Sequence, residues 1–227
     1  MNAIEVRKLH DRLIKQFYDF YRYTDSAHRI DHIRGVMSNV IRICYMQGWQ
    51  EHLKLALIAA ALHDIYSTKE GRADHHIQAF NWVLNNRPVL ARKYKLTFDE
   101  CYTIAYAAME HRGSFKGNYN SIISEIVAAA DRGIPSKEDV SSYISRSYLY
   151  ARDSQGKCIS DSKFHAVNHI QDKFGRNAYA KVPDWYEEIF ATQLAERLEL
   201  IEMLDIDFFT PELVEELENR LKQSNPM

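Results

Sequence analysis

The dipeptide His63-Asp64 constrains the fold of this chain more than any other feature, because it closes the largely apolar run from Leu53 to Leu62. A run of this length and composition predicts a buried helix. Two strongly polar groups at its end are costly to bury unless something compensates them. A metal ion compensates both, since imidazole nitrogen and carboxylate oxygen are ligands of first-row metals. For the dipeptide alone, the alternative is a polar cap at a helix end.

Further histidine and aspartate residues lie beside other apolar segments. His32 lies near the start of a segment whose apolar face continues through Val36, so its side chain is expected to point toward the core. Asp131 closes the apolar segment 125–130. Three helices could therefore bring together two imidazoles and two carboxylates, and this donor set suits Mn, Fe, Co, Ni or Zn. Water bound to such a metal has a lowered pKa and would be the nucleophile.

The bulk composition excludes several classes of protein. A chain of 227 residues with 46% hydrophobic residues can form one sizeable core. A net charge of −2 gives no reason to expect nucleic acid or an anionic membrane as partner. No apolar stretch reaches the roughly 18 residues of a membrane span, and we expect no secretory signal. The three cysteines are widely spaced, which favours a reducing compartment, and we expect a cytoplasmic protein.

The pattern of apolar residues is helical throughout, and it predicts an all-α, single-domain bundle of about nine or ten helices. We expect one domain over residues 1–227, with a C-terminal helix at 210–223. Thr97 to Glu100 forms a capping box that opens one helix. Pro88 is expected to end the helix before it, and Ser136 to cap a later one. The expected helices span 4–22, 31–46, 51–63, 74–86, 97–111, 121–131, 136–150, 161–174, 184–204 and 210–223.

The ordered pattern of these residues resembles the HD-domain superfamily of metal-dependent phosphohydrolases, in particular a branch of small bacterial and phage hydrolases. The resemblance covers about residues 23–204. It is carried by the segments 27–33, 59–65, Asp74-His75-His76, Glu110-His111 and 129–132. As a set these motifs are specific, although each alone is weak. The resemblance implies an all-α fold of the HD type and one or two divalent metal ions, Mg among them.

The resemblance also implies roles for individual residues. His32, His63, Asp64 and Asp131 would be metal ligands, with Asp64 bridging if two ions bind. His75 and His111 match positions that bind a second metal or contact substrate phosphate. His75 is preferred to His76, because Ile77 and Ala79 then continue its helix as in the family pattern. We expect Asp64 or His111 to transfer protons, and we assign His76, Arg112, Lys116 and Arg132 to substrate binding.

The chain departs from that branch at three places. Arg29 follows His28 where an aspartate is usual, Gly133 to Pro135 follow Asp131-Arg132, and no acidic residue closely follows Asp64. Glu70 and Asp74 are the nearest later carboxylates. Plainer interpretations also exist for single residues: His75 and His76 could be solvated at a helix N-terminus, and His111 could cap a helix C-terminus.

These observations lead to one expected function and two alternatives. We expect a phosphohydrolase that cleaves a phosphomonoester or phosphodiester bond of a nucleotide-like small molecule, with oligomer formation left open. The full set of six residues, His32, His63, Asp64, His75, His111 and Asp131, also matches di-iron oxygenases built on this fold. A non-catalytic nucleotide-binding module is the other alternative.

Overall fold

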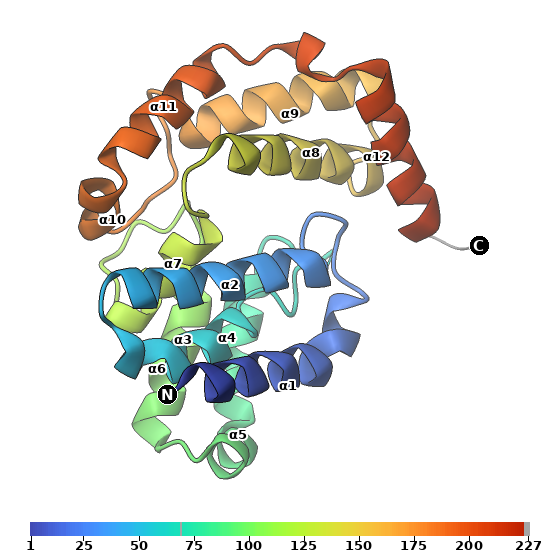
Figure 1. The fold of residues 1–227 in the computed structure, drawn as a ribbon. Helices are drawn as coiled ribbons and strands as arrows, with labels where there is room; N and C mark the ends of the chain where they lie inside the picture. Colours follow the sequence, from blue (N-terminus) through green and yellow to red (C-terminus); the bar gives the residue numbers. More distant parts are fainter. Residues whose placement is uncertain (69, 225–227) are drawn as a thin grey trace. The chain divides into compact units, whose positions relative to one another are not determined.

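The computed structural model describes residues 1–68 and 70–224, and these residues form twelve α-helices, two short 3₁₀ helices and no strand (Figure 1). The expected all-α class is therefore confirmed. No helix in the described part of the chain is long and apolar enough to cross a membrane. Residue contacts divide the chain into two compact units, and the single domain expected over 1–227 stays a prediction.

The first unit comprises Met1–Thr24, His28–Ile134 and Lys181–Asp184. It is helical over most of its length and also contains a 3₁₀ helix at Gln50–His52. Its α-helices are α1 (Ala3–Tyr21), α2 (Ile30–Met46), α3 (Leu53–Ala60), α4 (His75–Asn85), α5 (Arg87–Tyr94), α6 (Phe98–Glu110) and α7 (Ile122–Asp131).

The second unit comprises Asp25–Ala27, Pro135–Ala180 and the chain from Trp185 onward. Its α-helices are α8 (Lys137–Asp153), α9 (Ile159–Phe174), α10 (Asp184–Ile189), α11 (Ala191–Glu202) and α12 (Pro211–Ser224), with a 3₁₀ helix at Ile206–Phe208. Its core includes Tyr148, Ile170 and Ile201, and the guanidinium of Arg152 forms two hydrogen bonds with the carboxylate of Glu218 at 2.7 and 2.8 Å.

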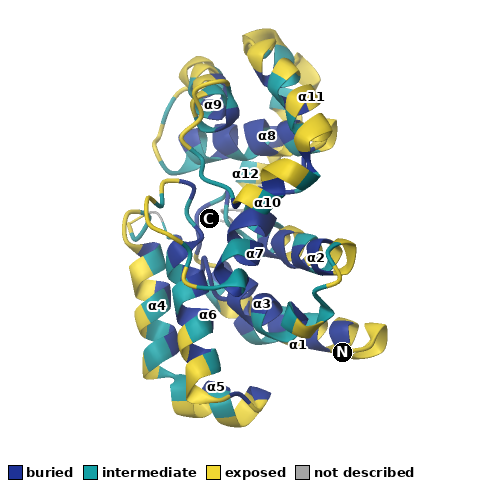
Figure 2. Cartoon of the chain, turned by 90° about the vertical axis from the view of Figure 1, so that its left-hand side faces the viewer, coloured by how far each residue is buried: buried dark blue, intermediate teal, exposed yellow. Residues whose placement is uncertain are grey.

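Helix α3 is the centre of the first unit. It contacts α1, α2, α6 and α7, and its residues from Ala56 to Ala60 are fully buried (Figure 2). The facing helices carry Ala107 and Ala108 in α6 and three consecutive alanines, 128–130, in α7. Because the distance between packed helices depends on side-chain size, these small residues let the three helices approach closely. The polar residues at the ends of these helices are thereby drawn together.

The local signals in the sequence explain most of the helix ends. Thr97 and Glu100 form the predicted capping box, and the hydroxyl of Ser136 accepts a hydrogen bond from the backbone N–H of Asp139 at 3.1 Å. Gly48 adopts a φ of 71° just after α2, a conformation that favours glycine.

Helix α4 ends before Pro88, as expected, but the expected helices left out α5, and the described residues form twelve α-helices where nine or ten were expected. Pro88 lies in the first turn of α5, where its missing N–H has no helical partner to lose. Two helix boundaries were wrong. The segment 184–204 is two helices, α10 and α11, separated at Phe190. The apolar helix expected over 51–63 ends at Ala60, and turns carry the chain through His63 and Asp64.

Candidate metal centre

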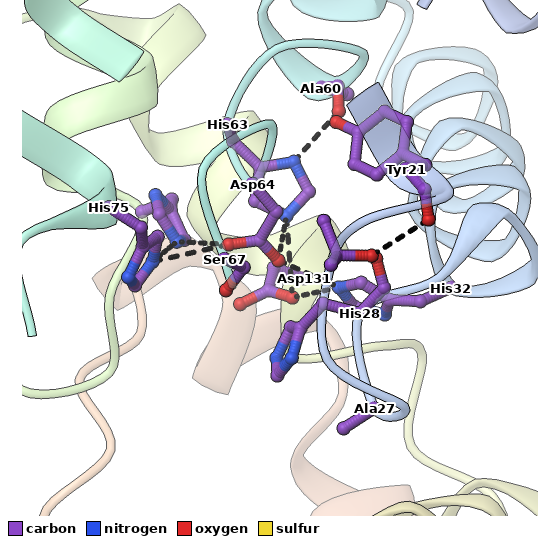
Figure 3. A network of polar contacts seen from close by, with 12 residues as sticks. Tyr21, Ala27, His28, His32, Ala60, His63, Asp64, Ser67, His75 and Asp131 are labelled. Carbon is purple, nitrogen blue, oxygen red and sulfur yellow. Dashed lines mark hydrogen bonds and ion pairs between the residues drawn. The ribbon is translucent and has the colours of Figure 1, made fainter. Parts of the chain in front are cut away.

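Five helices of the first unit end or begin at one point. His63 and Asp64 follow the C-terminal end of α3, His111 follows α6, and Asp131 is the last residue of α7. His32 lies in the first turn of α2, and His75 is the first residue of α4. Segments up to about a hundred residues apart in the chain thus contribute to one cluster (Figure 3).

The first group of potential ligands consists of His32, His63, Asp64 and Asp131, which offer ligand atoms within 4.8 Å of one another. Nε2 of His32 lies 3.3 Å from Oδ2 of Asp64 and 3.2 Å from Oδ1 of Asp131. Nε2 of His63 lies 3.1 Å from Oδ2 of Asp64 and 3.9 Å from Oδ1 of Asp131. These four residues are the set that the sequence predicted.

The second group consists of Asp64, His75 and His111. Oδ1 of Asp64 lies 3.2 Å from Nε2 of His75 and 3.4 Å from Nε2 of His111, and the two nitrogens are 3.3 Å apart. The two oxygens of Asp64 therefore face different groups of nitrogens. This geometry suits two cations joined by one bridging carboxylate.

The backbone fixes which nitrogen of three histidines carries a proton. Nδ1 of His63 lies 2.7 Å from the carbonyl of Ala60, Nδ1 of His75 lies 2.8 Å from the carbonyl of Arg72, and Nδ1 of His111 lies 2.7 Å from the carbonyl of Ala108. A carbonyl oxygen only accepts hydrogen bonds, so each Nδ1 must be the donor. In the neutral imidazoles the lone pairs of Nε2 then face the oxygens of Asp64. Such a contact is repulsive unless a proton or a cation lies between the two atoms, and a cation in this position is the usual arrangement of metal-binding histidines.

The electrostatics of the buried groups agree with that geometry. Burial raises the pKa of Asp64, but the charges of His63 and His28 and hydrogen bonds with neighbouring histidines outweigh it and hold the pKa well below its usual value. Burial lowers the pKa of His63, but the carboxylates of Asp64 and Asp131 raise it to about 9. Burial lowers the pKa of His111 to about 3. The carboxylate of Asp64 therefore stays ionised, and the carboxylates around His63 favour a proton or a cation on the Nε2 atom of that ring.

Arg132 connects the two groups of potential ligands through Asp131 and the backbone of His111. Its side chain is 1% exposed, its Nη1 donates to Oδ2 of Asp131 at 2.6 Å, and its Nη2 donates to the carbonyl of His111 at 2.5 Å. After burial, the Arg132 charge is the largest influence on Asp131, and the net effect holds the pKa of that carboxyl well below its usual range. Arg132 thereby links Asp131 with the segment of His111, and its assignment to substrate binding stays a proposal.

The other residues assigned to substrate binding lie outside the two groups. The ring of His76 packs against that of His75, with centroids 5.5 Å apart, and burial together with Arg112 and His75 lowers the pKa of His76 to about 4. Nη1 of Arg112 donates to the carbonyl of Ala73 at 2.8 Å, and Lys116 is exposed. Of the adjacent pair, His75 is the residue that enters the cluster.

Three residues near the centre were missed by the sequence analysis. Ser67 is fully buried and its N–H donates to the carbonyl of Asp64. The hydroxyl of Tyr21 donates to the carbonyl of Ala61 at 2.9 Å, which fixes the turn before His63. Nη1 of Arg72 lies 3.0 Å from Oγ of Ser67. Arg72 lies in a loop of polar residues, and such residues are usually solvated, so the sequence contained no signal that singled it out.

Fold and site together define an all-α protein in which helix ends gather two groups of histidine and aspartate residues that could hold a metal ion. In a comparison with protein families, residues 29–133, slightly less than half of the chain, match the model of the HD domain. This segment, which contains the whole cluster, belongs to the HD-domain superfamily. Comparisons with curated proteins and with solved structures found no match.

Proposed function

We propose that the protein is a metal-dependent phosphohydrolase that cleaves a phosphomonoester or phosphodiester bond of a nucleotide-like small molecule through a metal-activated water. The observation that carries the proposal is Asp64, whose two oxygens face two separate groups of imidazole nitrogens. Membership of the HD-domain superfamily, whose members are mostly metal-dependent hydrolases, supports the same reaction class.

The residues present fit one or two divalent cations. His32, His63, Asp64 and Asp131 would hold the first, and Asp64, His75 and His111 the second. A cation bound there supplies Lewis-acid polarisation of a phosphoryl oxygen and acidifies water. The mixed nitrogen and oxygen donors suit Mn, Fe, Co, Ni or Zn.

The chain's own residues would supply the remaining parts of catalysis. Asp64 or His111 would transfer protons where only one cation is bound, because a second cation would occupy Nε2 of His111 and the remaining oxygen of Asp64. Arg132 would keep Asp131 and His111 in register through its two hydrogen bonds. Arg112, Lys116 and His76 lie on segments next to the centre and stay proposals for substrate contact.

The test is a screen of purified protein against nucleotides and phosphorylated metabolites with added Mn²⁺, Co²⁺, Ni²⁺, Zn²⁺ or Mg²⁺, read by released products. We expect hydrolysis with at least one metal, and loss of it in the His63→Ala, Asp64→Ala double variant. The matched control is a Glu51→Ala, His52→Ala variant, which removes an adjacent acid–histidine pair from the surface at 3.5 Å. Full activity in the His63, Asp64 variant would end the proposal.

The six-residue set also suits a di-iron oxygenase, which needs two irons and consumes O₂. The two-group geometry is the specific observation that keeps this second candidate. Metal analysis of protein purified without added metal, followed by oxygen-electrode measurements, separates the two. One non-iron metal per chain together with phosphate release removes the oxygenase.

A further inference from the structure

The loop between Asp64 and α4 brings a guanidinium to the edge of the metal centre. Nη1 of Arg72 lies 2.7 Å from Nδ1 and 2.8 Å from Nε2 of His28, and 3.0 Å from Oγ of Ser67. Arg72 is half-buried and Ser67 is fully buried. Residues from three places in the sequence thus meet at one nitrogen atom.

This position adjoins the proposed ligands on two sides. The ring of His28 lies 5.3 Å, centroid to centroid, from that of His32, and His28 acts electrostatically on Asp64 (both labelled in Figure 3). The backbone carbonyl of Arg72 accepts the hydrogen bond from Nδ1 of His75. The main chain of Arg72 therefore contacts the potential ligand His75, and its side chain contacts His28, whose ring packs against the potential ligand His32.

The loop is built closely enough to fix this placement. The N–H of Gly71 donates to Oγ1 of Thr68 at 2.9 Å, and the N–H of Asp74 donates to the carbonyl of Gly71 at 3.1 Å. A Cβ atom at Gly71 would lie 2.8 Å from the carbonyl oxygen of Tyr66, which is a contact that side-chain carbons do not make. Glycine therefore allows the tight approach that directs Arg72 back toward His28.

The chemistry at this position is that of an anion subsite. Arginine is always charged and its planar group matches the oxygens of a phosphate. A neutral imidazole offers one acceptor and one N–H, so the two nitrogens of His28 cannot both accept hydrogen bonds from Arg72. Because Nη1 of Arg72 already contacts both nitrogens of His28, a phosphate oxygen would replace this contact and accept hydrogen bonds from the guanidinium and from the imidazole N–H.

We propose that Arg72 and His28, supported by Ser67, form a subsite that binds a terminal phosphate group and so selects phosphomonoester dianions over diesters. A monoester phosphorus carries three terminal oxygens and a diester two, so an extra pair of donors beside the centre favours the monoester. This selection rests on the proposed hydrolase function, whereas the anion subsite itself rests on the contacts of Arg72.

The first experiment measures binding of inorganic phosphate to metal-free and Mn²⁺-loaded protein by calorimetry. We expect Arg72→Ala to weaken phosphate binding by about tenfold or more. Arg72→Lys should weaken it less, because lysine keeps the positive charge but lacks the planar guanidinium that forms paired hydrogen bonds with phosphate. The matched control is Arg34→Ala, an exposed arginine of α2 paired with Asp31 at 3.0 Å. Circular dichroism and thermal unfolding of each variant show that it is folded.

The second experiment compares kcat/KM for p-nitrophenyl phosphate and bis(p-nitrophenyl) phosphate. We expect Arg72→Ala to lower kcat/KM by at least about tenfold more for the monoester than for the diester. Phosphate binding equal to wild type in Arg72→Ala, or no phosphate binding by wild type in either form, overturns the subsite. An unchanged monoester preference overturns the selection. Phosphate binding through Arg72 in a protein that hydrolyses no phosphoester would reject the hydrolase and leave the subsite standing.

Discussion

Replacement of Arg132 by methionine tests whether one buried arginine holds the two halves of the centre together. The guanidinium is 1% exposed and donates to the carboxylate of Asp131 at 2.6 Å and to the carbonyl of His111 at 2.5 Å. A hydrogen bond to a charged group contributes about 1.5–3 kcal/mol. Methionine fills much of the volume but leaves the half-buried carboxylate of Asp131 without its guanidinium partner, and removal of one partner of a pair with a buried member costs up to about 3–5 kcal/mol. We therefore expect Arg132→Met to lower the free energy of unfolding by about 3–5 kcal/mol.

The assay is urea unfolding in the presence of a chelator, so that added metal does not compensate Asp131. The matched control is Arg34→Met, which removes the same kind of group from an exposed pair with Asp31, and an exposed pair contributes about 0.2–1 kcal/mol. A second measurement is metal content after saturation with Mn²⁺, which we expect to fall in Arg132→Met and not in Arg34→Met. Equal unfolding free energies for the two variants would refute the role given to Arg132.

Two further predictions concern the metal centre, and a third concerns the carboxyl of Asp139, which pairs with Arg197 in the second unit. His75→Ala is expected to lower the number of Mn²⁺ ions bound per chain, and His76→Ala to leave it unchanged, as measured by mass spectrometry of the native protein; equal losses would contradict the assignment of His75. Chelation is expected to lower the unfolding temperature and Mn²⁺ to restore it, because a ligand that binds only the folded state stabilises it, and a temperature independent of metal would argue against the centre. Burial raises the pKa of Asp139 to about 6, although the charge of Arg197 opposes this shift. The protonated carboxyl therefore stabilises the fold fully below pH 3.8, its ordinary pKa, and this stabilisation of up to about 3 kcal/mol is lost as the pH rises through 6. Asp139→Asn should remove this decline in unfolding experiments between about pH 4 and 7.

Much of the fold and the set of candidate ligands follows from local sequence. The capping box at Thr97 to Glu100 is an interaction between residues three apart, so it can be found without knowledge of the fold. Pro88 correctly predicted the end of one helix, but a proline also suits the first turn of the next, and the local sequence did not reveal that α5 begins there.

The sequence by itself determined which residues are chemically able to hold a cation and that each stands next to an apolar, helix-forming segment. Hydrophobic periodicity and residue chemistry are properties of neighbours along the chain, and His32, His63, Asp64 and Asp131 could be found from them. Only the tertiary structure decided that Asp64 faces both groups of potential ligands and that His75, not His76, belongs to one of them. It also decided that Arg132 contacts Asp131 and that Arg72 contacts Ser67. These are contacts between distant segments, and their geometry depends on how closely the alanine-rich helices pack.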